Sequence, residues 1–428
     1  MTSSRSILLL YAARGLRGFG DGFAIILLPV YLSALGYGPV AIGAVATAAL
    51  LGSAATTLAV GVLARRYPLR NLLLLGALVM AATGAALPAF EPIAVIAIVA
   101  FLGTINPSSG DIGFLIPLEH ASLAQGVAAE KRTQTFAHYS LIGALATAAG
   151  SLAAAAPQLL AAWGMDQIAA IKIMFYAYGA LGLIAAALYR LIPLHRTTVS
   201  TAPPAVLGAS RRIVVKLAAL FSIDAFAGGF VVQSLLALWL FERFELSLAE
   251  ASLFFFWSNL LAAFSYPVAA WLSRRVGLIN TMVFTHIPSS LCLIAAAFAP
   301  NLLIALILLL VRSALSQMDV PTRTSYVMSV VTPQEQAAAA SFTAVPRTLA
   351  SSISPAFAGV LLASSFAGWP LVICGALKIG YDLALLYSFR HIKPPEEMDR
   401  HASRGPQDSS LDTRGEDPKP AGSPGATG

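Results

Sequence analysis

The chain is dominated by apolar stretches that are long enough to cross a lipid bilayer. A helix that spans the hydrocarbon core of about 30 Å needs roughly 20 predominantly apolar residues. The stretches that meet this requirement are 7–35, 40–63, 71–90, 93–122, 133–156, 167–192, 213–241, 248–272, 278–299, 301–331, 337–363 and 369–389. Charged residues make up only 11% of the chain, against about 25% in soluble domains. We therefore predict an all-α integral membrane protein with about twelve transmembrane helices.

The least apolar internal segment divides these stretches into two sets of six. This segment, 193–212, contains adjacent prolines together with Ser and Thr, and it is expected to be a cytoplasmic linker. It separates an N-terminal six-helix bundle, 1–192, from a C-terminal six-helix bundle, 213–392. Residues 393–428 are polar and rich in Pro, Gly and Ser. They lack the apolar content of a folded domain, so we expect a disordered cytoplasmic tail.

Basic residues are concentrated in one set of loops. They are Arg65, Arg66, Arg70, Lys131, Arg132, Arg190, Arg196, Arg211, Arg212, Arg274 and Arg275. The opposite loops contain Arg243, which Glu242 and Glu245 flank, and Lys172 lies near the outer start of its stretch. Cytoplasmic loops carry an excess of Lys and Arg. This asymmetry predicts that both termini lie in the cytoplasm and that the protein resides in the cell membrane.

The two halves resemble each other where their second apolar stretch ends. Residues 61–67, GVLARRY, align with residues 270–276, AWLSRRV. Matching segments also occur in the same order elsewhere in the two halves. Parallel repeats of this kind are typical of transporters whose two bundles alternately expose one central site.

The first of these loops resembles the loop motif of the major facilitator superfamily. The positions that match the family pattern are Gly61, Leu63, Ala64, Arg66 and Arg70, whereas Arg65 and Pro68 depart from it. The resemblance covers the chain up to about residue 393. It implies a monomeric rocker-switch permease whose first, fourth, seventh and tenth helices line a central cavity.

Most of the candidate functional residues are charges inside the apolar stretches. Each costs about 2.5–3.5 kcal/mol at a helix centre, so it must face protein or water. The predicted substrate-binding residues are Arg17, Arg312, Asn106 and Ser316. The predicted proton-coupling acids are Asp21, Asp111, Asp224 and Asp319. The predicted gating residues are Arg66, Arg275, Glu119 and Arg323. Arginine suits an anionic group because its guanidinium binds carboxylate or phosphate with two donors.

Some of these charges have a simpler interpretation as local ion pairs. Arg17 with Asp21, and Asp319 with Arg323, are four residues apart and can neutralise each other on one helix face. For Lys378 and Asp382 we prefer this interpretation, because the last helix is peripheral in the family.

Two helices are also expected to be interrupted. Proline occurs with polar residues at 106–111 and at 319–323, and a proline leaves a carbonyl without its helical donor. Such backbone is tolerated in a membrane only beside protein or a water-filled cavity. The alternative is a passive kink in a long helix.

These features favour a secondary active transporter of a small organic solute. The chain contains no Gly-Lys dipeptide and hence no phosphate-binding P-loop, which excludes direct use of ATP by this chain. We expect proton coupling, an anionic or zwitterionic solute, and export, since 354–359 partly resembles an exporter motif. The alternatives are a facilitated uniporter, a membrane-embedded enzyme and a sensor. No cofactor, metal or nucleic acid is expected, and Cys292 and Cys374 are isolated.

Overall fold

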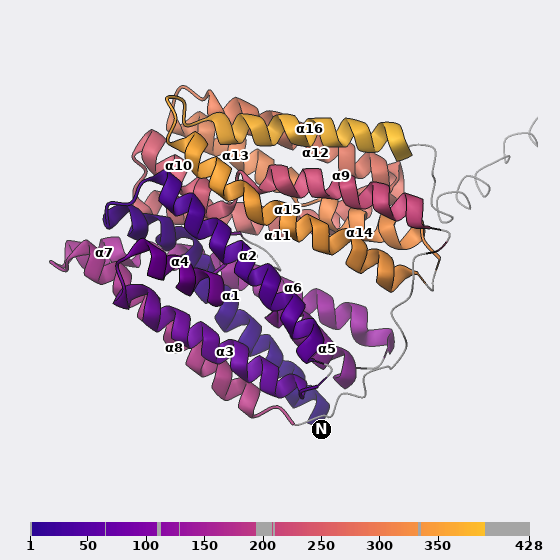
Figure 1. The fold of residues 1–428 in the computed structure, drawn as a ribbon, viewed down its shortest axis with the longest axis horizontal. Helices are drawn as coiled ribbons and strands as arrows, with labels where there is room; N and C mark the ends of the chain where they lie inside the picture. The colour runs from indigo at the N-terminus through magenta and orange to yellow at the C-terminus, as the bar shows by residue number, and fades with distance from the viewer. Residues whose placement is uncertain are drawn as a thin grey trace, which may run out of the picture.

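The computed structural model describes residues 2–64, 66–108, 113–127, 129–193, 208, 210–332 and 335–389. Asp111, Arg65, most of the expected linker and the expected C-terminal tail lie outside these residues. The described residues are arranged in helices joined by short connecting segments. Figure 1 shows the first half of the chain in the lower part of the view and the second half in the upper part.

Within its described residues, the first half contains eight helices and one short 3₁₀ turn. They are α1 (Thr2–Ala34), α2 (Pro39–Leu63), α3 (Leu69–Ala86), η1 (Leu87–Ala89), α4 (Ile93–Leu102), α5 (Leu115–Gly126), α6 (Ala129–Ala153), α7 (Ala156–Ala162) and α8 (Gln167–Arg190). In this half α1 packs against α6 and α8, and α3 packs against α8.

The part of the second half that the structure describes contains a further eight helices. They are α9 (Arg211–Gly229), α10 (Gln233–Phe244), α11 (Leu248–Val276), α12 (Leu278–Ala297), α13 (Leu302–Ser316), α14 (Asp319–Ser329), α15 (Gln336–Leu362) and α16 (Trp369–Phe389). Here α15 packs against α9, and α12 packs against α13 and α16.

The expected membrane spans correspond to these elements, and several spans consist of two consecutive helices. Within the described residues, ten helices or helix pairs are long and apolar enough to cross a membrane. The two expected spans outside this group have clear reasons for their absence. The expected span 93–122 is divided into α4 and α5, and α15 carries Arg347 and many Ser and Thr residues.

The interruption between α4 and α5 confirms the one expected from the proline at position 107. The Asn106 side chain turns back and accepts a hydrogen bond from the Ser108 backbone amide at 3.0 Å. The Pro107 carbonyl accepts a hydrogen bond from the Ser234 amide at 3.1 Å. Ser234 lies in the first turn of α10, where backbone amides have no helical partner. The two interrupted segments, one from each half, therefore satisfy each other's backbone groups.

The interruption in the tenth expected span lies at Gln317 and Met318, between α13 and α14. Pro321 falls in the first turn of α14, where its missing amide leaves no helical hydrogen bond unmade. A further interruption, between α9 and α10, was not expected from the sequence. It follows Gly228 and Gly229, and a Cβ on Gly229 would lie only 1.9 Å from Ser354 Oγ of α15. Close helix packing explains this glycine.

Among the described residues, the buried apolar side chains of the two halves meet in one shared cluster at one end of the molecule. One cluster includes Leu27 and Leu50 of the first half together with Trp239 and Phe255 of the second half. A second cluster contains residues of the first half alone, and a third contains residues of the second half alone. We call the end with the shared cluster the closed end.

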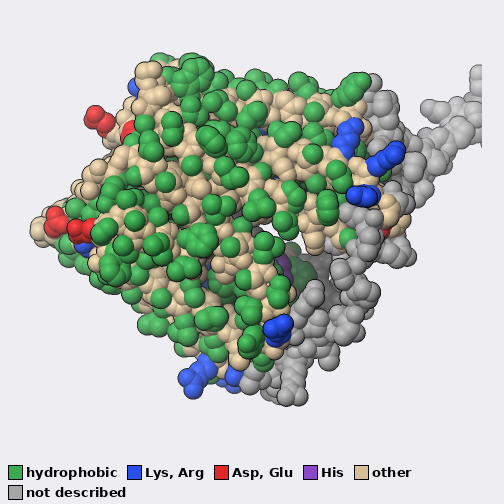
Figure 2. Space-filling view, in the orientation of Figure 1, with side chains coloured by type: hydrophobic (Ala, Val, Ile, Leu, Met, Phe, Trp, Pro, Cys, Tyr) green, Lys and Arg blue, Asp and Glu red, His purple; other side chains and the backbone are tan. Residues whose placement is uncertain are grey.

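The other end carries most of the basic residues, and we call it the basic end. Arg66, Arg190, Arg211 and Arg275 lie there, where α2, α8 and α11 end and α9 begins. Figure 2 shows Lys and Arg mostly at this end of the visible face and Asp and Glu at the other end. The separate apolar clusters of the two halves both lie toward this end.

Contacts across the closed end are close and include polar bonds. A Cβ on Gly43 of α2 would lie 2.5 Å from the Pro355 carbonyl and 2.9 Å from Gly359 Cα, both on α15. The Asn259 side-chain amide donates to Ser151 Oγ at 3.0 Å, which joins α11 to α6. Near the basic end, a Cβ on Gly61 of α2 would meet no atom of the described residues within 4 Å. The halves therefore diverge from the closed end toward the basic end.

Candidate functional site

A cavity of about 660 Å³ lies between the two halves. Its walls come from α2 and α5 of the first half and from α9, α10, α11, α13, α14, α15 and α16 of the second half. Figure 2 shows a hollow between the halves on the side of the basic end. Pockets for small molecules measure about 300–1,000 Å³. The cavity has the size for a small organic solute.

Two predicted proton-coupling acids lie on the cavity wall and are held by cations. Asp224 of α9 accepts contacts from Lys378 Nζ at 2.7 Å and from Arg323 Nη1 at 3.1 Å. Arg323 also contacts Asp319 Oδ2 at 2.9 Å within α14. All four residues line the cavity, and the Asp224 side chain is only 6% exposed. Arg323, predicted as a gating residue, therefore links both carboxylates.

A histidine extends this cluster behind the cavity wall. His286 Nε2 lies 3.1 Å from Lys378 Nζ, and its Nδ1 lies 3.1 Å from both carboxylate oxygens of Asp382. Since Lys378 has only donors, a neutral His286 that accepts at Nε2 and donates from Nδ1 satisfies every partner. The preferred pairing of Lys378 with Asp382 is therefore wrong. Lys378 instead points to Asp224 and lines the cavity, although it lies on the last helix.

A second buried polar cluster lies within the first half. Arg17 forms an ion pair with Glu119, and the Tyr139 hydroxyl also donates to Glu119. The Tyr189 hydroxyl donates to the other Glu119 oxygen at 2.6 Å, and Glu119 is fully buried. The structure thus brings together a predicted substrate-binding residue and a predicted gating residue, on α1 and α5, away from the walls of the large cavity.

Asp21 lies at a separate small pocket of about 30 Å³ in the first half. It accepts a hydrogen bond from the Tyr178 hydroxyl at 3.2 Å, and this hydroxyl lies 2.9 Å from Thr104 Oγ1. Arg17 borders the same pocket but contacts Glu119 instead. Among the described residues, Asp21 forms no ion pair.

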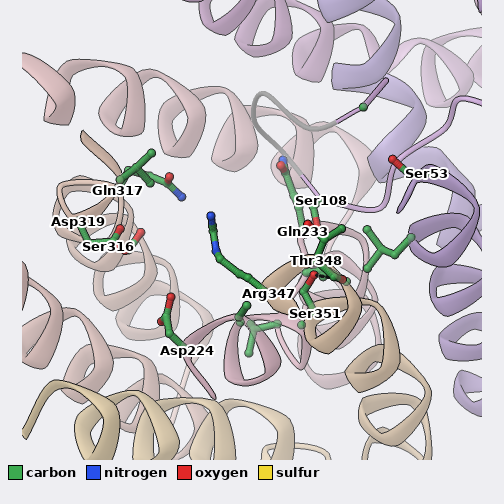
Figure 3. A pocket seen from close by; sticks show the side chains of 18 of the residues that line it. Ser53, Ser108, Asp224, Gln233, Ser316, Gln317, Asp319, Arg347, Thr348 and Ser351 are labelled. Atoms are coloured by element: carbon green, nitrogen blue, oxygen red, sulfur yellow. Dashed lines mark hydrogen bonds between the residues drawn. The ribbon is translucent and has the colours of Figure 1, made fainter. Parts of the chain in front are cut away.

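Two arginines line the large cavity without a carboxylate partner among the described residues. Arg312 of α13 lies on the wall together with Ser316, as predicted for substrate-binding residues. Arg347 of α15 was not predicted. Figure 3 shows its side chain projecting into the open space between Gln317 on one side and Gln233 on the other. Its buried Nε atom has no hydrogen-bond partner among these residues.

The remaining predicted residues lie farther from the cavity. Asn106 is 8% exposed and holds the segment between α4 and α5, but it is not part of the cavity wall. Arg66 and Arg275 are exposed at the basic end, and Arg275 lies over the Trp271 ring at 4.5 Å. Neither forms an ion pair within the described residues. Asp111 lies outside the part of the chain that the structure describes.

Three cavity residues, Arg347, Lys378 and Gln233, were not predicted as functional candidates from the sequence. Arg347 could have been predicted, because an arginine inside an apolar stretch is costly to place in a membrane and is therefore a functional candidate. Gln233 could not have been predicted, because a neutral amide side chain at the start of a helix is common. No cluster of three or more His, Cys, Asp or Glu side chains suited to a metal occurs in the part of the chain that the structure describes.

The comparisons with known proteins agree with this architecture. The family model described as Major Facilitator Superfamily matches residues 10–355 and 218–415. An uncharacterized membrane protein of Saccharomyces cerevisiae is 23% identical over 438 residues, which cover 93% of this chain and 98% of that protein.

Two solved transporters have the same fold at low identity. A D-xylose-proton symporter matches with a TM-score of 0.69 and 16% identity over 89% of this chain and 96% of its own. A bacterial homologue of the human lysosomal transporter Spinster, in an inward-facing conformation, matches with a TM-score of 0.66 and 15% identity over 90% and 94%. The chain therefore belongs to the major facilitator superfamily and is a multi-pass membrane transporter of small solutes that works by alternating access, not an enzyme.

Proposed function

We propose that the protein is a secondary active transporter that couples the movement of a small organic solute to the movement of protons. The observation that carries this proposal is a set of carboxylates inside the apolar helices. Asp224 and Asp319 are buried on the wall of the large cavity, and Asp21 is half-buried at the small pocket of the first half. Ionisable groups this deep in a membrane protein mark substrate paths and proton relays. The D-xylose-proton symporter has the same fold, so the fold is compatible with proton coupling. This likeness says nothing about the substrate of the present chain.

Asp21 is the first candidate for the coupling acid. A proton can neutralise Asp21 without breaking an ion pair, because its described contact is the hydroxyl of Tyr178. Neutralising Asp224 would instead separate it from both Lys378 and Arg323. Asp224 and Asp319 then serve to exchange partners during the conformational change. Asp111 stays a candidate from its place in the sequence.

The basic end is proposed to face the cytoplasm. Cytoplasmic loops carry an excess of Lys and Arg, and this end holds Arg66, Arg190, Arg211 and Arg275. Both termini then lie in the cytoplasm, and the cavity is open to the cytoplasm. We propose the cell membrane as the location, the monomer as the working unit, and export of an anionic or zwitterionic solute as the direction. A facilitated uniporter is the alternative function.

The test uses purified protein in liposomes of known orientation that enclose a pH-sensitive dye. A thermal-shift screen of small organic acids, amino acids and sugars first identifies a solute that binds the protein. We expect wild-type protein to move protons when that solute is added. The Asp21→Asn variant should still exchange labelled solute across the membrane, but it should lose the solute-driven proton signal.

Glu242→Gln is the matched control, because Glu242 is an exposed carboxylate near the closed end. It should keep both the exchange and the proton signal. Solute transport by the wild type without any proton movement would show a uniporter and contradict the proposed coupling. An unchanged proton signal in Asp21→Asn would transfer the coupling role to another acid.

A further inference from the structure

The cavity carries more positive than negative charge. Its described lining contains the four permanent cations Arg312, Arg323, Arg347 and Lys378 but only two carboxylates, Asp224 and Asp319. Arg323 and Lys378 contact these carboxylates directly. Arg312 and Arg347 form no ion pair among the described residues.

Arg347 places part of this positive charge inside the cavity (Figure 3). Its side chain extends from α15 into the middle of the cavity rather than along the wall (Figure 3). Burial of an unpaired guanidinium is costly, and the Arg347 Nε atom has no hydrogen-bond partner among the described residues. The cost falls when a planar oxyanion accepts two hydrogen bonds from the guanidinium. The cavity thus presents a guanidinium Nε donor that has no acceptor among the described residues.

Neutral polar side chains line the same cavity as the two arginines. Gln233 is 8% exposed, and neither its Oε1 nor its Nε2 atom has a hydrogen-bond partner among the described residues. Ser316, Gln317 and Thr348 lie on the same cavity surface. Buried amides without partners are uncommon in proteins and call for an explanation. These groups suit the hydroxyl, carbonyl or amide groups of a solute that also carries an oxyanion.

We propose that the solute is a small organic anion and that Arg347 and Arg312 bind its carboxylate or phosphate group, while Gln233 hydrogen-bonds the remainder. This inference rests on the proposed transport function and specifies its substrate class. It replaces Arg17, which Glu119 already pairs, with Arg347 as the partner of Arg312. The site is formed by α10, α13 and α15 of the second half.

The test compares the rates at which two thiol reagents of similar size and opposite charge reach the cavity. The probes are the sulfonatoethyl and trimethylammonioethyl methanethiosulfonates. They are applied to purified protein in which Cys292→Ala and Cys374→Ala remove the native thiols. Thr348→Cys places a thiol beside Arg347, and Ser364→Cys places one at the exposed closed end. Local fields of this kind change encounter rates by about tenfold or more.

We expect the anionic reagent to be favoured over the cationic one at Thr348→Cys by about tenfold relative to Ser364→Cys. Arg347→Gln or Arg312→Gln, added to Thr348→Cys, should lower this preference several-fold, and Arg347→Lys should retain it. Arg243→Gln is the control, because Arg243 is exposed at the closed end, and it should change nothing.

Equal reagent preference at Thr348→Cys and Ser364→Cys would overturn the anion site. An unchanged preference after both glutamine substitutions would overturn it as well. The comparison of the two cysteine positions needs no arginine variant, so it decides the question even where one fails to insert. The thiol-modification rates can be measured without transport. If the anion preference is found but solute transport moves no protons, the anion site is supported and only the proposed proton coupling is contradicted.

Discussion

Asp224 holds two cations inside the membrane, and this makes it the most sensitive single residue of the cavity wall. Its loss leaves Lys378 without its carboxylate and Arg323 with Asp319 alone. Removing one partner of a buried ion pair costs about 3–5 kcal/mol. We expect Asp224→Ala to lower the melting temperature in detergent strongly. Lys378→Met in the same chain should recover part of the loss, because it removes the orphaned charge.

An exposed ion pair supplies the comparison for this prediction. Lys172 and Glu91 lie 3.2 Å apart, and the Glu91 side chain is 66% exposed. Exposed pairs contribute about 0–1 kcal/mol, so Glu91→Ala should change the melting temperature little. The loss of stability in the double variant Asp224→Ala with Lys378→Met should be smaller than the sum of the losses in the two single variants. Equal values would show that the Asp224–Lys378 ion pair does not stabilise the protein.

At the residue scale, the sequence predicted which side chains are charged in the membrane but not their partners. Helical spacing placed Arg17 and Asp21 on one face, yet Arg17 pairs with Glu119, 102 positions away. Lys378 was matched to Asp382 by the same spacing and contacts Asp224 instead. Spacing determines which face of a helix a residue occupies, whereas tertiary packing determines what that face meets.

At the scale of elements, the crossing of α2 and α15 holds the closed end together. Gly43 allows this crossing, since any side chain there would overlap with Pro355 and Gly359. We expect Gly43→Val to open the closed end and to lower the fraction of molecules whose cavity is open at the basic end. In vesicles, a thiol at Thr348→Cys should then react several-fold more slowly with reagent added at the basic end.

Gly61→Val is the matched control on the same helix, because a Cβ on Gly61 would meet no described atom within 4 Å. It should leave the reaction rate at Thr348→Cys unchanged. Equal rates in Gly43→Val and the parent chain would show that this crossing does not set the conformation.

The interruptions of the helices were predictable only in part. Proline marked the segment between α4 and α5 and the start of α14, because a ring nitrogen cannot donate within a helix. The interruption after Gly229 had no such signal. A glycine pair in an apolar stretch is equally compatible with a continuous helix packed closely against a neighbour. The close contact with Ser354 explains the glycine at position 229 but not the break in the helix.

For the whole molecule, the repeat at 61–67 and 270–276 and the length of the apolar stretches were sufficient to predict two bundles of six spans. Which end is closed was not predictable, since the same sequence must form both conformations of an alternating-access cycle. The answer lies in packing: Leu50 and Trp239 share one apolar cluster, whereas the clusters at the basic end stay separate.

The unmatched charge of Arg312 and Arg347 also makes the empty carrier responsive to membrane voltage. Each charge that crosses the full field gains about 2.3 kcal/mol per 100 mV. A negative cytoplasm then draws the empty site inward, and it also repels a bound anion outward, which matches the proposed direction. Clamping vesicles at a negative interior potential should speed thiol modification at Thr348→Cys from the inside. Arg312→Gln with Arg347→Gln should abolish that voltage dependence, and its persistence in this variant would place the voltage-sensing charge elsewhere.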